Sequence, residues 1–587
     1  MAEPRNDSNR RRSAFRALLV LSIGITVSII LPNLRGEPPT GSRPKEDLKE
    51  GKVQIRFPIS NSFENETPQS KTPQSKTPQL KTPEKQLPPI DGKLTADLAR
   101  ASTSQTTPNI GVNLPVSVAT DEERNQKIAV DWKDPLFVFF VTGNQTGYIE
   151  PCGCTGLENQ KGGLSRRDTF LTSIRQRGWD VIPIDGGGQV FQEHEQRRRG
   201  RQADIKFSWT VAAFNLLEYQ ATTFGEDDLM LTIDSLMHPM IDKAGLFVSA
   251  NVSILPEYDV KYKTIVVKNK KIGITAVLGD ENAKKVENED ITISAAILAL
   301  KEVSTKLRAE NCDFTVLISH ASLEESRIIA KAVPDFSLIV TSGGFGEPTF
   351  QPEQIPGTSS LMVQVGTKGM YTGLFGVFDE PKQPFRYQRV ALSSQFEDSP
   401  RIMELFGKYQ DELKAVTIEG LGKRPMTHPT TREFVGSEKC GECHTTAFEV
   451  WKDTDHAHAT DSIVQPPHRS MARHFDPECL SCHVTGWNPQ SFAPYRTGYE
   501  SLEATPHMVA NGCENCHGPG SKHVAAELGD VSANAELLEK LRNEMKLPLE
   551  RASDKCAVCH DFDNSPNFHK PNAFEAFWEK IKHYGKD

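Results

Sequence analysis

The chain has 587 residues, which predicts two or three folded units at roughly 100–200 residues per domain. It carries 68 Lys and Arg against 77 Asp and Glu, a formal net charge of -9, which argues against nucleic acid as its main partner. Only 37% of the residues are hydrophobic, because a long segment near the N-terminus has almost no core-forming side chains.

The N-terminal segment reads as an export signal. Residues 17–31 form an apolar run, and the positive charges that precede it are Arg5, Arg10, Arg11, Arg12 and Arg16. No small-x-small cleavage site follows, so an uncleaved signal anchor over 1–32 is favoured over a cleaved signal, although the run is short for a spanning helix of about 17–25 residues. Arginines before the run place the rest of the chain outside the cytoplasm. We therefore expect a protein anchored in the inner membrane, with its folded parts on the periplasmic side.

Residues 33–128 are expected to be a disordered tether. A five-residue repeat, Thr-Pro-Gln-Ser-Lys or a close variant, begins at Thr67, Thr72, Thr77 and Thr82. Proline at every fifth position blocks helix and sheet, and the polar side chains cannot build a core. An extended segment of this kind reaches about 3 Å per residue.

Residues 129–395 show strands that alternate with helices. Apolar runs at 136–141, 181–184, 314–319 and 336–340 each end in a polar or glycine-rich turn, and helical stretches lie between them at 208–217 and 294–310. This pattern predicts an α/β sandwich, whose ligands sit at the carboxyl ends of the strands.

The order of the turns resembles the metallophosphoesterase domain of periplasmic 5′-nucleotidases. The corresponding segments are 143–147, 162–166, 185–188, 225–228, His320 and 342–345. In that family these turns supply metal ligands, but here most of those positions hold other residues: Asn144, Thr146, Gly188, Glu226, Asp227, Gly343 and Phe345. Only His320 keeps its identity, whereas a two-metal hydrolase needs several carboxylates and imidazoles. We expect a non-hydrolytic domain for docking or for binding a small molecule; a haem-linked 5′-nucleotidase or phosphoesterase is the alternative.

Cys152 and Cys154 follow the first strand turn. A Cys-x-Cys pair at this point fits a strained disulfide, a metal pair or a soft ligand for a bound group, and the sequence leaves these open.

A connecting helix and linker are expected at 396–433, followed by a domain at 434–587 that carries four Cys-x-x-Cys-His motifs. This spacing is the attachment signature of c-type haem, in which two thiols bond one porphyrin and the adjacent His reaches the iron. Zinc sites and disulfide frameworks do not require His directly after each pair. We therefore predict four covalent haem c groups and no catalytic side chain. The attachment residues are Cys440, Cys443, Cys479, Cys482, Cys513, Cys516, Cys556 and Cys559, with His444, His483, His517 and His560 on iron.

Thirteen of the sixteen histidines lie at or beyond His428, which leaves nine in addition to the motif histidines. The region resembles the tetrahaem cytochrome c family whose best-known member takes electrons from hydroxylamine oxidoreductase, because loop residues match as well as the motifs. The matching loop segments are 451–457, 484–486, 517–524 and 577–583. The resemblance implies that His456, His523 and His583 are distal ligands. For the remaining haem, His474, His468 or no protein ligand stays open.

The predicted architecture is thus multidomain: an α/β sandwich followed by a mostly α or irregular multihaem cytochrome c domain. The predicted function is electron transfer through four haems to a redox partner protein. The alternative is an oxidoreductase acting on a small nitrogen or sulfur species at an open haem, because low-spin electron-transfer haems have two axial ligands.

Overall fold

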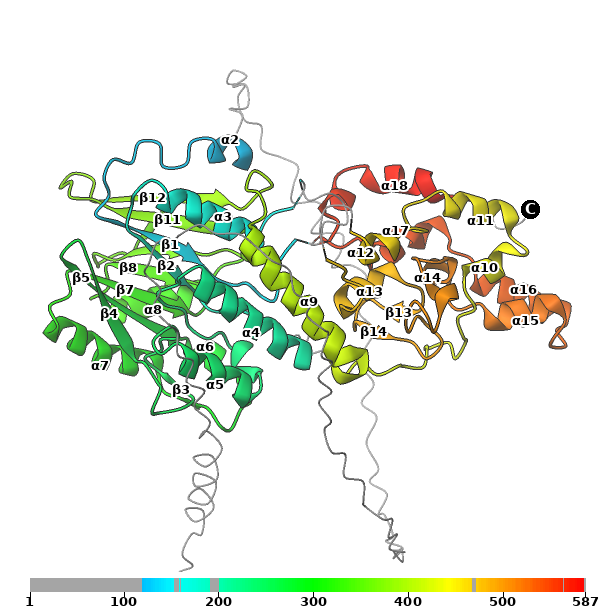
Figure 1. Ribbon diagram of the computed structural model, residues 1–587, viewed down its shortest axis with the longest axis horizontal. Helices are drawn as coiled ribbons and strands as arrows, with labels where there is room; N and C mark the ends of the chain where they lie inside the picture. Colours follow the sequence, from blue (N-terminus) through cyan, green and yellow to red (C-terminus); the bar gives the residue numbers. More distant parts are fainter. Residues whose placement is uncertain are drawn as a thin grey trace, which may run out of the picture. The chain divides into compact units, whose positions relative to one another are not determined.

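The computed structural model describes residues 119–151, 158, 160–190, 200–466, 471–562 and 564–584 (Figure 1). All of these belong to one compact unit, Val112–Asp587. The segment at 1–32, most of the tether at 33–128, and the Cys152 and Cys154 pair lie outside the described residues.

The expected membrane anchoring needs correction. In the part of the chain that the structure describes, no helix combines the length and apolarity needed to cross a bilayer. The apolar run at 17–31, on which the expectation rested, is shorter than a typical spanning helix and lies outside that part. This finding contradicts the expectation of a membrane-anchored protein.

A short helix, α2 (Asp121–Asn125), lies inside the segment expected to be a tether. Thr120 and Glu123 form a reciprocal capping box at its start, which satisfies backbone N–H groups that a short helix leaves unpaired. The Asp121 carboxylate forms ion pairs with Lys161 and Arg389, so α2 is held against the α/β fold.

Two β-sheets form the centre of the α/β region. The first has the strand order β12-β11-β1-β2, in which β1 runs parallel to β2 and antiparallel to β11. Its strands are β1 (Phe137–Thr142), β2 (Val181–Asp185), β11 (Tyr371–Val377) and β12 (Phe385–Ala391). The second has the order β4-β5-β7-β8-β10-β9, with parallel pairing from β5 through β10. Its strands are β4 (Tyr262–Val267), β5 (Lys270–Leu278), β7 (Phe314–His320), β8 (Leu338–Thr341), β9 (Glu353–Gln354) and β10 (Leu361–Gln364).

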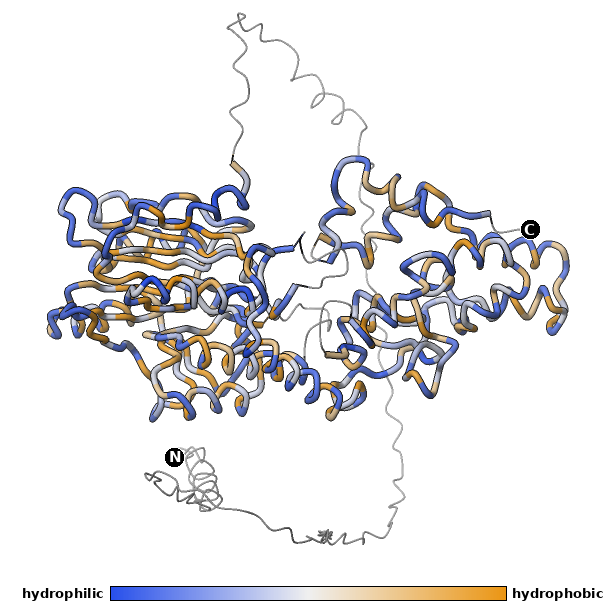
Figure 2. The backbone as a smooth tube through the Cα atoms, turned by 45° about the horizontal axis from the view of Figure 1, so that its top comes forward, coloured by the Kyte–Doolittle hydropathy of each residue, from blue (hydrophilic) through white to orange (hydrophobic). Residues whose placement is uncertain are grey.

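Alternating side chains of each strand pack on opposite faces. Phe137, Phe139 and Val141 of β1 join the core between the two sheets, whereas Val138 and Phe140 pack against helices on the outer face. Figure 2 shows the hydrophobic residues running along these stacked strands. The β1 run is buried on both faces, which is why it reads as continuously apolar.

Helices cover the outer faces of both sheets (Figure 1). Those on the first sheet are α3 (Leu164–Arg175), α4 (Arg201–Leu216) and α9 (Pro400–Gly420); those on the second are α7 (Ala296–Ala309) and α8 (Leu323–Ala332). The smaller elements are η2 (Asp228–Met230), α5 (Ile233–Asp242), β3 (Val252–Ser253), α6 (Asp280–Ala283) and β6 (Thr292–Ile293). Helix α9 lies in the expected connection, yet it buries Ile402, Phe406 and Leu413 against the α/β core.

The C-terminal region is built from short helices and irregular segments, as the sequence predicts. Its elements are α10 (Ser437–Gly441), α11 (Thr445–Lys452), α12 (Asp461–Val464), α13 (Pro477–His483), β13 (Trp487–Asn488), β14 (Ala493–Pro494), η3 (Pro506–Met508), α14 (Cys513–His517), α15 (Ser521–Leu528), α16 (Ala535–Glu544), α17 (Leu549–Ala557), η4 (Pro566–His569) and α18 (Ala573–Ile581). A small cluster around Phe434, Leu480 and Trp487 forms its hydrophobic core. Both halves of the predicted fold class are confirmed.

Candidate functional site

Each Cys-x-x-Cys-His motif adopts a helical turn. The second and third motifs lie within α13 and α14, and the first and fourth begin near the ends of α10 and α17. The backbone N–H of His444 donates to the backbone carbonyl of Cys440 at 3.0 Å, and that of His560 donates to the backbone carbonyl of Cys556 at 2.9 Å, which closes the turn in both cases. A helical turn places residues three and four apart on one face, so both thiols and the following imidazole can address one group.

Three motif histidines face a distant histidine. The ring centroids are 6.2 Å apart for His444 and His523, 6.1 Å for His456 and His560, and 5.8 Å for His517 and His583. An ion with bonds of about 2 Å to both imidazoles holds their centroids about 6 Å apart. These are the three distal histidines that the sequence resemblance implies.

In three of these histidines, His517, His560 and His583, the Nδ1 atom has a hydrogen-bond partner, whereas Nδ1 of His444 and of His523 is buried without one. Nδ1 of His517 donates to the carbonyl of Met545 at 2.7 Å, and Nδ1 of His583 donates to the carbonyl of Ile581 at 2.8 Å. Nδ1 of His560 lies 3.0 Å from Ser565 Oγ. Because a carbonyl only accepts, Nδ1 of His517 and His583 carries the proton, and Nε2 keeps its lone pair for iron. The donor set therefore fits haem iron.

The second motif has its own surroundings. Nδ1 of His483 donates to the carbonyl of Ala459 at 2.7 Å, the same arrangement as in His517. His474 packs on Phe475, with ring centroids 3.9 Å apart. His468 lies outside the described residues. The assignment of His474 to this iron stays a prediction.

The motifs themselves are neighbours in space. The side chains of Cys440 and Cys513 are neighbours, as are those of Cys482 and Cys559. The first attachment point thus lies beside the third, and the second lies beside the fourth. Groups bound at these points are adjacent in pairs.

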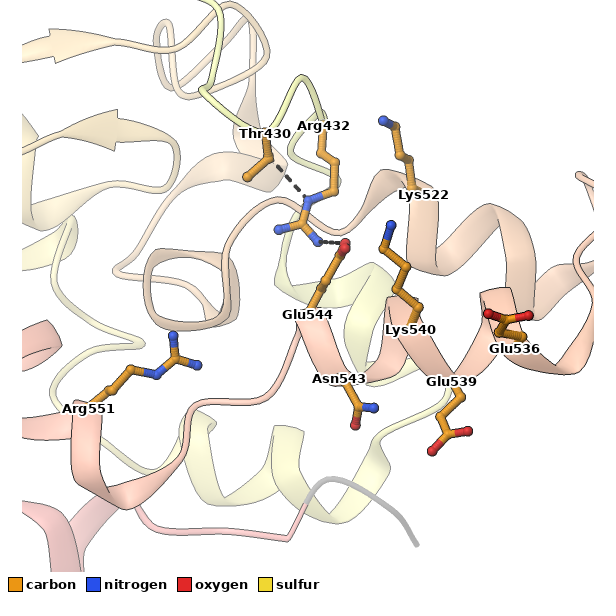
Figure 3. A pocket seen from close by; sticks show the side chains of 9 residues that line it. All are labelled: Thr430, Arg432, Lys522, Glu536, Glu539, Lys540, Asn543, Glu544 and Arg551. Atoms are coloured by element: carbon orange, nitrogen blue, oxygen red, sulfur yellow. Dashed lines mark hydrogen bonds and ion pairs between the residues drawn. The ribbon is translucent and has the colours of Figure 1, made fainter. Parts of the chain in front are cut away.

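A cavity of about 950 Å³ is lined by side chains of α15, α16 and α17 and of the segment at 430–432 (Figure 3). Lys522 of α15 precedes His523, and Arg432 contacts Met545, whose carbonyl accepts from His517. The four cationic side chains of its lining are Arg432, Lys522, Lys540 and Arg551. Three glutamates, Glu536, Glu539 and Glu544, also line the cavity, and Arg432 forms an ion pair with Glu544 at 3.3 Å.

The strand ends of the α/β region form a second, compact site. Asp228 is fully buried and accepts hydrogen bonds from the backbone N–H groups of Gly188, Gln189, Val190 and Gly225 at 2.8–3.1 Å. It thereby ties the turn after β2 to the segment that begins at Gly225. Sequence reasoning gave Asp228 no role, because one acidic residue in an acidic run carries no distinguishing pattern.

His320 at the end of β7 fills the space between these turns. Its Nδ1 lies 2.8 Å from the carbonyl of Gly186, and its Nε2 lies 3.0 Å from Glu226 Oε2. A Cβ at Gly188 would lie 3.1 Å from the His320 ring, and one at Gly225 would lie 2.8 Å from it. Glycines are thus required around the ring, and Gly188 stands where the family has a metal-bridging carboxylate.

The surroundings of His320 favour its protonated form. Burial lowers the pKa of His320, but the hydrogen bond and charge of Glu226 outweigh this and raise it above the ordinary value of 6.5. Burial opposes ionisation of Glu226, yet His320 and Lys285 lower its pKa to about 2. With Nδ1 and Nε2 both engaged as donors, the ring offers no lone pair to a metal ion.

The two regions have separate relatives. Residues 439–518 match the family Cytochrome c554 and c-prime. Cytochrome c-554 of Nitrosomonas europaea is 30% identical over 154 residues, which cover 23% of this chain and 60% of that protein. An apyrase of Aedes albopictus is 24% identical over 292 residues, which cover 44% of this chain and 50% of the relative. The chain therefore spans about half to three fifths of the length of these curated relatives.

Among solved structures, a 5′-nucleotidase precursor from Thermus thermophilus aligns with a TM-score of 0.41 and 18% identity, covering 48% of this chain and 59% of that one. The sequence matches bear out the two-part architecture: a metallophosphoesterase-like region precedes a c-type cytochrome region, whose family implies covalently bound haem c.

Proposed function

We propose that this chain is an electron-transfer protein with four haem c groups, and that its α/β region is a non-hydrolytic unit for docking or ligand binding. The observation that carries the proposal is the set of three imidazole pairs, each joining a motif histidine to a distant histidine at about 6 Å.

Each bound haem supplies a one-electron Fe(III)/Fe(II) couple. The eight motif cysteines would hold the haem groups by thioether bonds, and His444, His517 and His560 would ligate iron. His523, His583 and His456 would be the second protein ligands of the same three haems. Two imidazoles on one iron leave no site for a small molecule, so these three positions favour electron transfer over substrate chemistry.

The contacts between the motif cysteines support electron transfer between neighbouring haems. Cys440 beside Cys513 joins the first and third positions, and Cys482 beside Cys559 joins the second and fourth. The first and third haems, and the second and fourth, would therefore be neighbours, and a redox protein would exchange electrons with an exposed haem.

The α/β region is proposed to be non-hydrolytic because His320, the one family metal-ligand position that keeps its residue type, forms an ion pair with Glu226. His320 binds Glu226 and the Gly186 carbonyl, and Gly188 provides no carboxylate to bridge two ions. In this proposal the region has the sheets and turns of a metallophosphoesterase-like fold but lacks the metal ligands that two-metal hydrolysis needs.

A stepwise reductive titration of the purified holoprotein, followed by optical spectroscopy, tests the electron-transfer proposal. We expect four one-electron transitions and low-spin spectra for three of the four haems, with no carbon monoxide adduct at those three. Carbon monoxide binding to all four reduced haems would contradict it.

A further inference from the structure

The segment that precedes the second haem motif is docked on the α/β region. Met471 and Phe475 pack against the core formed by α3, α4 and α9. The Arg473 guanidinium pairs with the Glu150 carboxylate, and both side chains are nearly buried. Lys414 of α9 lies over the Phe475 ring, 5.1 Å from its centroid. Residues 471–478 therefore have a fixed position relative to the α/β region.

Asp476 links this segment to the motif helix itself. It is the N-cap of α13, where its side chain accepts from the backbone N–H of Glu478 at 2.9 Å. It also accepts from Gln202 Nε2 at 2.9 Å and from the Tyr409 hydroxyl at 3.2 Å, two side chains of the α/β region. A buried cap with partners on another region holds the first turn of α13 in place.

Lys206 of α4 supplies a positive charge at the same helix. Its Nζ lies 2.7 Å from Glu478 Oε1 and donates to the Gly147 carbonyl at 3.0 Å. The Lys206 side chain is 9% exposed and that of Glu478 is 26% exposed, so solvent screens this pair less than a surface pair. Gly147 lies in the turn after β1, which connects this pair to the strand ends.

Cys479, the first attachment cysteine of the second motif, is surrounded by these charges. Burial raises the pKa of its thiol, Asp476 and Glu478 raise it further, and Arg473 and Lys206 lower it. Each of the four side chains therefore lies within electrostatic range of the sulfur that bonds the second haem.

We propose that the α/β region tunes the reduction potential of the haem at the second motif, with Lys206 as the residue that supplies the tuning charge across the interface. The proposal rests on the proposed function and gives the α/β region a specific role within it. A nearby cation favours the reduced haem, and a nearby anion favours the oxidised one. Lys206 thus raises the reduction potential of the haem at the second motif, and Glu478 lowers it.

The test uses charge-neutralising variants of the full-length holoprotein. Lys206→Met is expected to lower one of the four reduction potentials, and Glu478→Gln is expected to raise the same one. Each shift should be on the order of tenfold in the one-electron equilibrium constant, which is about 59 mV. The double variant should return close to the wild-type value, and Lys206→Arg, which keeps the charge, should stay close to it.

The matched control is the ion pair of Lys408 and Glu404 on α9, which is exposed and has a similar length of 2.9 Å. Lys408→Met and Glu404→Gln should leave all four potentials unchanged. Shifts of Lys206→Met and Glu478→Gln in the same direction, or no shift in either, would overturn the proposal. The haem content of each variant, measured by mass spectrometry, is a separate readout: four haems with unshifted potentials refute the tuning role and leave the electron-transfer proposal standing.

Discussion

His517 and His583 face each other with their ring centroids 5.8 Å apart, although one ends a Cys-x-x-Cys-His motif and the other follows the terminal helix α18. Both rings anchor Nδ1 on a backbone carbonyl, of Met545 and Ile581 respectively. These two hydrogen bonds orient the imidazoles and leave Nε2 of each ring as the nitrogen that can ligate iron.

Removing one distal histidine should open one iron. In His583→Ala, His523→Ala and His456→Ala we expect carbon monoxide binding to the reduced protein to rise by about one haem equivalent, with loss of low-spin character at that haem. Difference spectra of the purified variants measure this. The matched control is His458→Ala, since His458 is an exposed histidine of the same region. An unchanged carbon monoxide titration in His583→Ala would show that His583 is not an axial ligand.

The α/β region should have no nucleotidase or phosphomonoesterase activity. Gly188 lacks the bridging carboxylate, and both nitrogens of His320 are engaged. Assays with AMP and with nitrophenyl phosphate, each with added Mg²⁺ or Mn²⁺, should give no metal-dependent turnover. A turnover above about 1 s⁻¹ that disappears in His320→Ala would contradict this expectation.

Gly188→Ala should destabilise the α/β region more than Gly178→Ala. Both glycines have a positive φ, +73° and +77°, so alanine at either position costs about 1–2 kcal/mol of conformational strain. At Gly188 the added Cβ also meets His320 at 3.1 Å and Asn144 at 3.2 Å, whereas Gly178 has open space. Urea denaturation followed by circular dichroism compares the free energies of unfolding. Equal losses of unfolding free energy in the two variants would show that the His320 ring does not occupy the space next to Gly188.

The pair of His320 and Glu226 should make stability depend on pH at both ends of the range. The pKa of His320 is raised in the folded state, so its contribution is complete below about 6.5 and is lost as pH rises through the folded value. The pKa of Glu226 is lowered from 4.5 to about 2, so its contribution is complete above 4.5 and is lost as pH falls toward 2. The contribution of the pair is therefore greatest between pH 4.5 and 6.5.

Urea denaturation of the wild type and Glu226→Gln across pH 3 to 9 measures this contribution. The difference in unfolding free energy between them should peak inside that window and shrink on both sides. Glu324→Gln removes an exposed partner of Arg327 and serves as the control. A difference that stays constant with pH would show that Glu226 and His320 do not titrate as a pair.

Local sequence patterns predicted much of this molecule. The four motifs and the apolar strands that end in glycine-rich turns follow from short-range chemistry, and the structure brings together His456, His523 and His583 with motif histidines as the resemblance implied. The packing of α9 on the α/β core was not predicted from the sequence, because an amphipathic pattern shows that one face of a helix is buried but not which surface it packs against.

The interface between the two regions was also not predictable. Lys206 and Glu478 are far apart in the chain, and neither carries a periodic or motif signal that would pair it with the other. The same holds for Glu150 and Arg473. The geometry of the ion pair between His320 and Glu226 depends on Gly187 and Gly188 of one turn and Gly225 of another, which come together around the His320 ring.

The number of covalent haems per chain tests the central claim most directly. Intact-protein mass spectrometry of the holoprotein, after acid–acetone extraction of non-covalent haem, should show four haem additions. Cys479→Ser/Cys482→Ser should show three, because the second motif loses both of its thioether bonds. Three or fewer additions on the homogeneous wild-type protein, or four on the double-serine variant, would contradict the account.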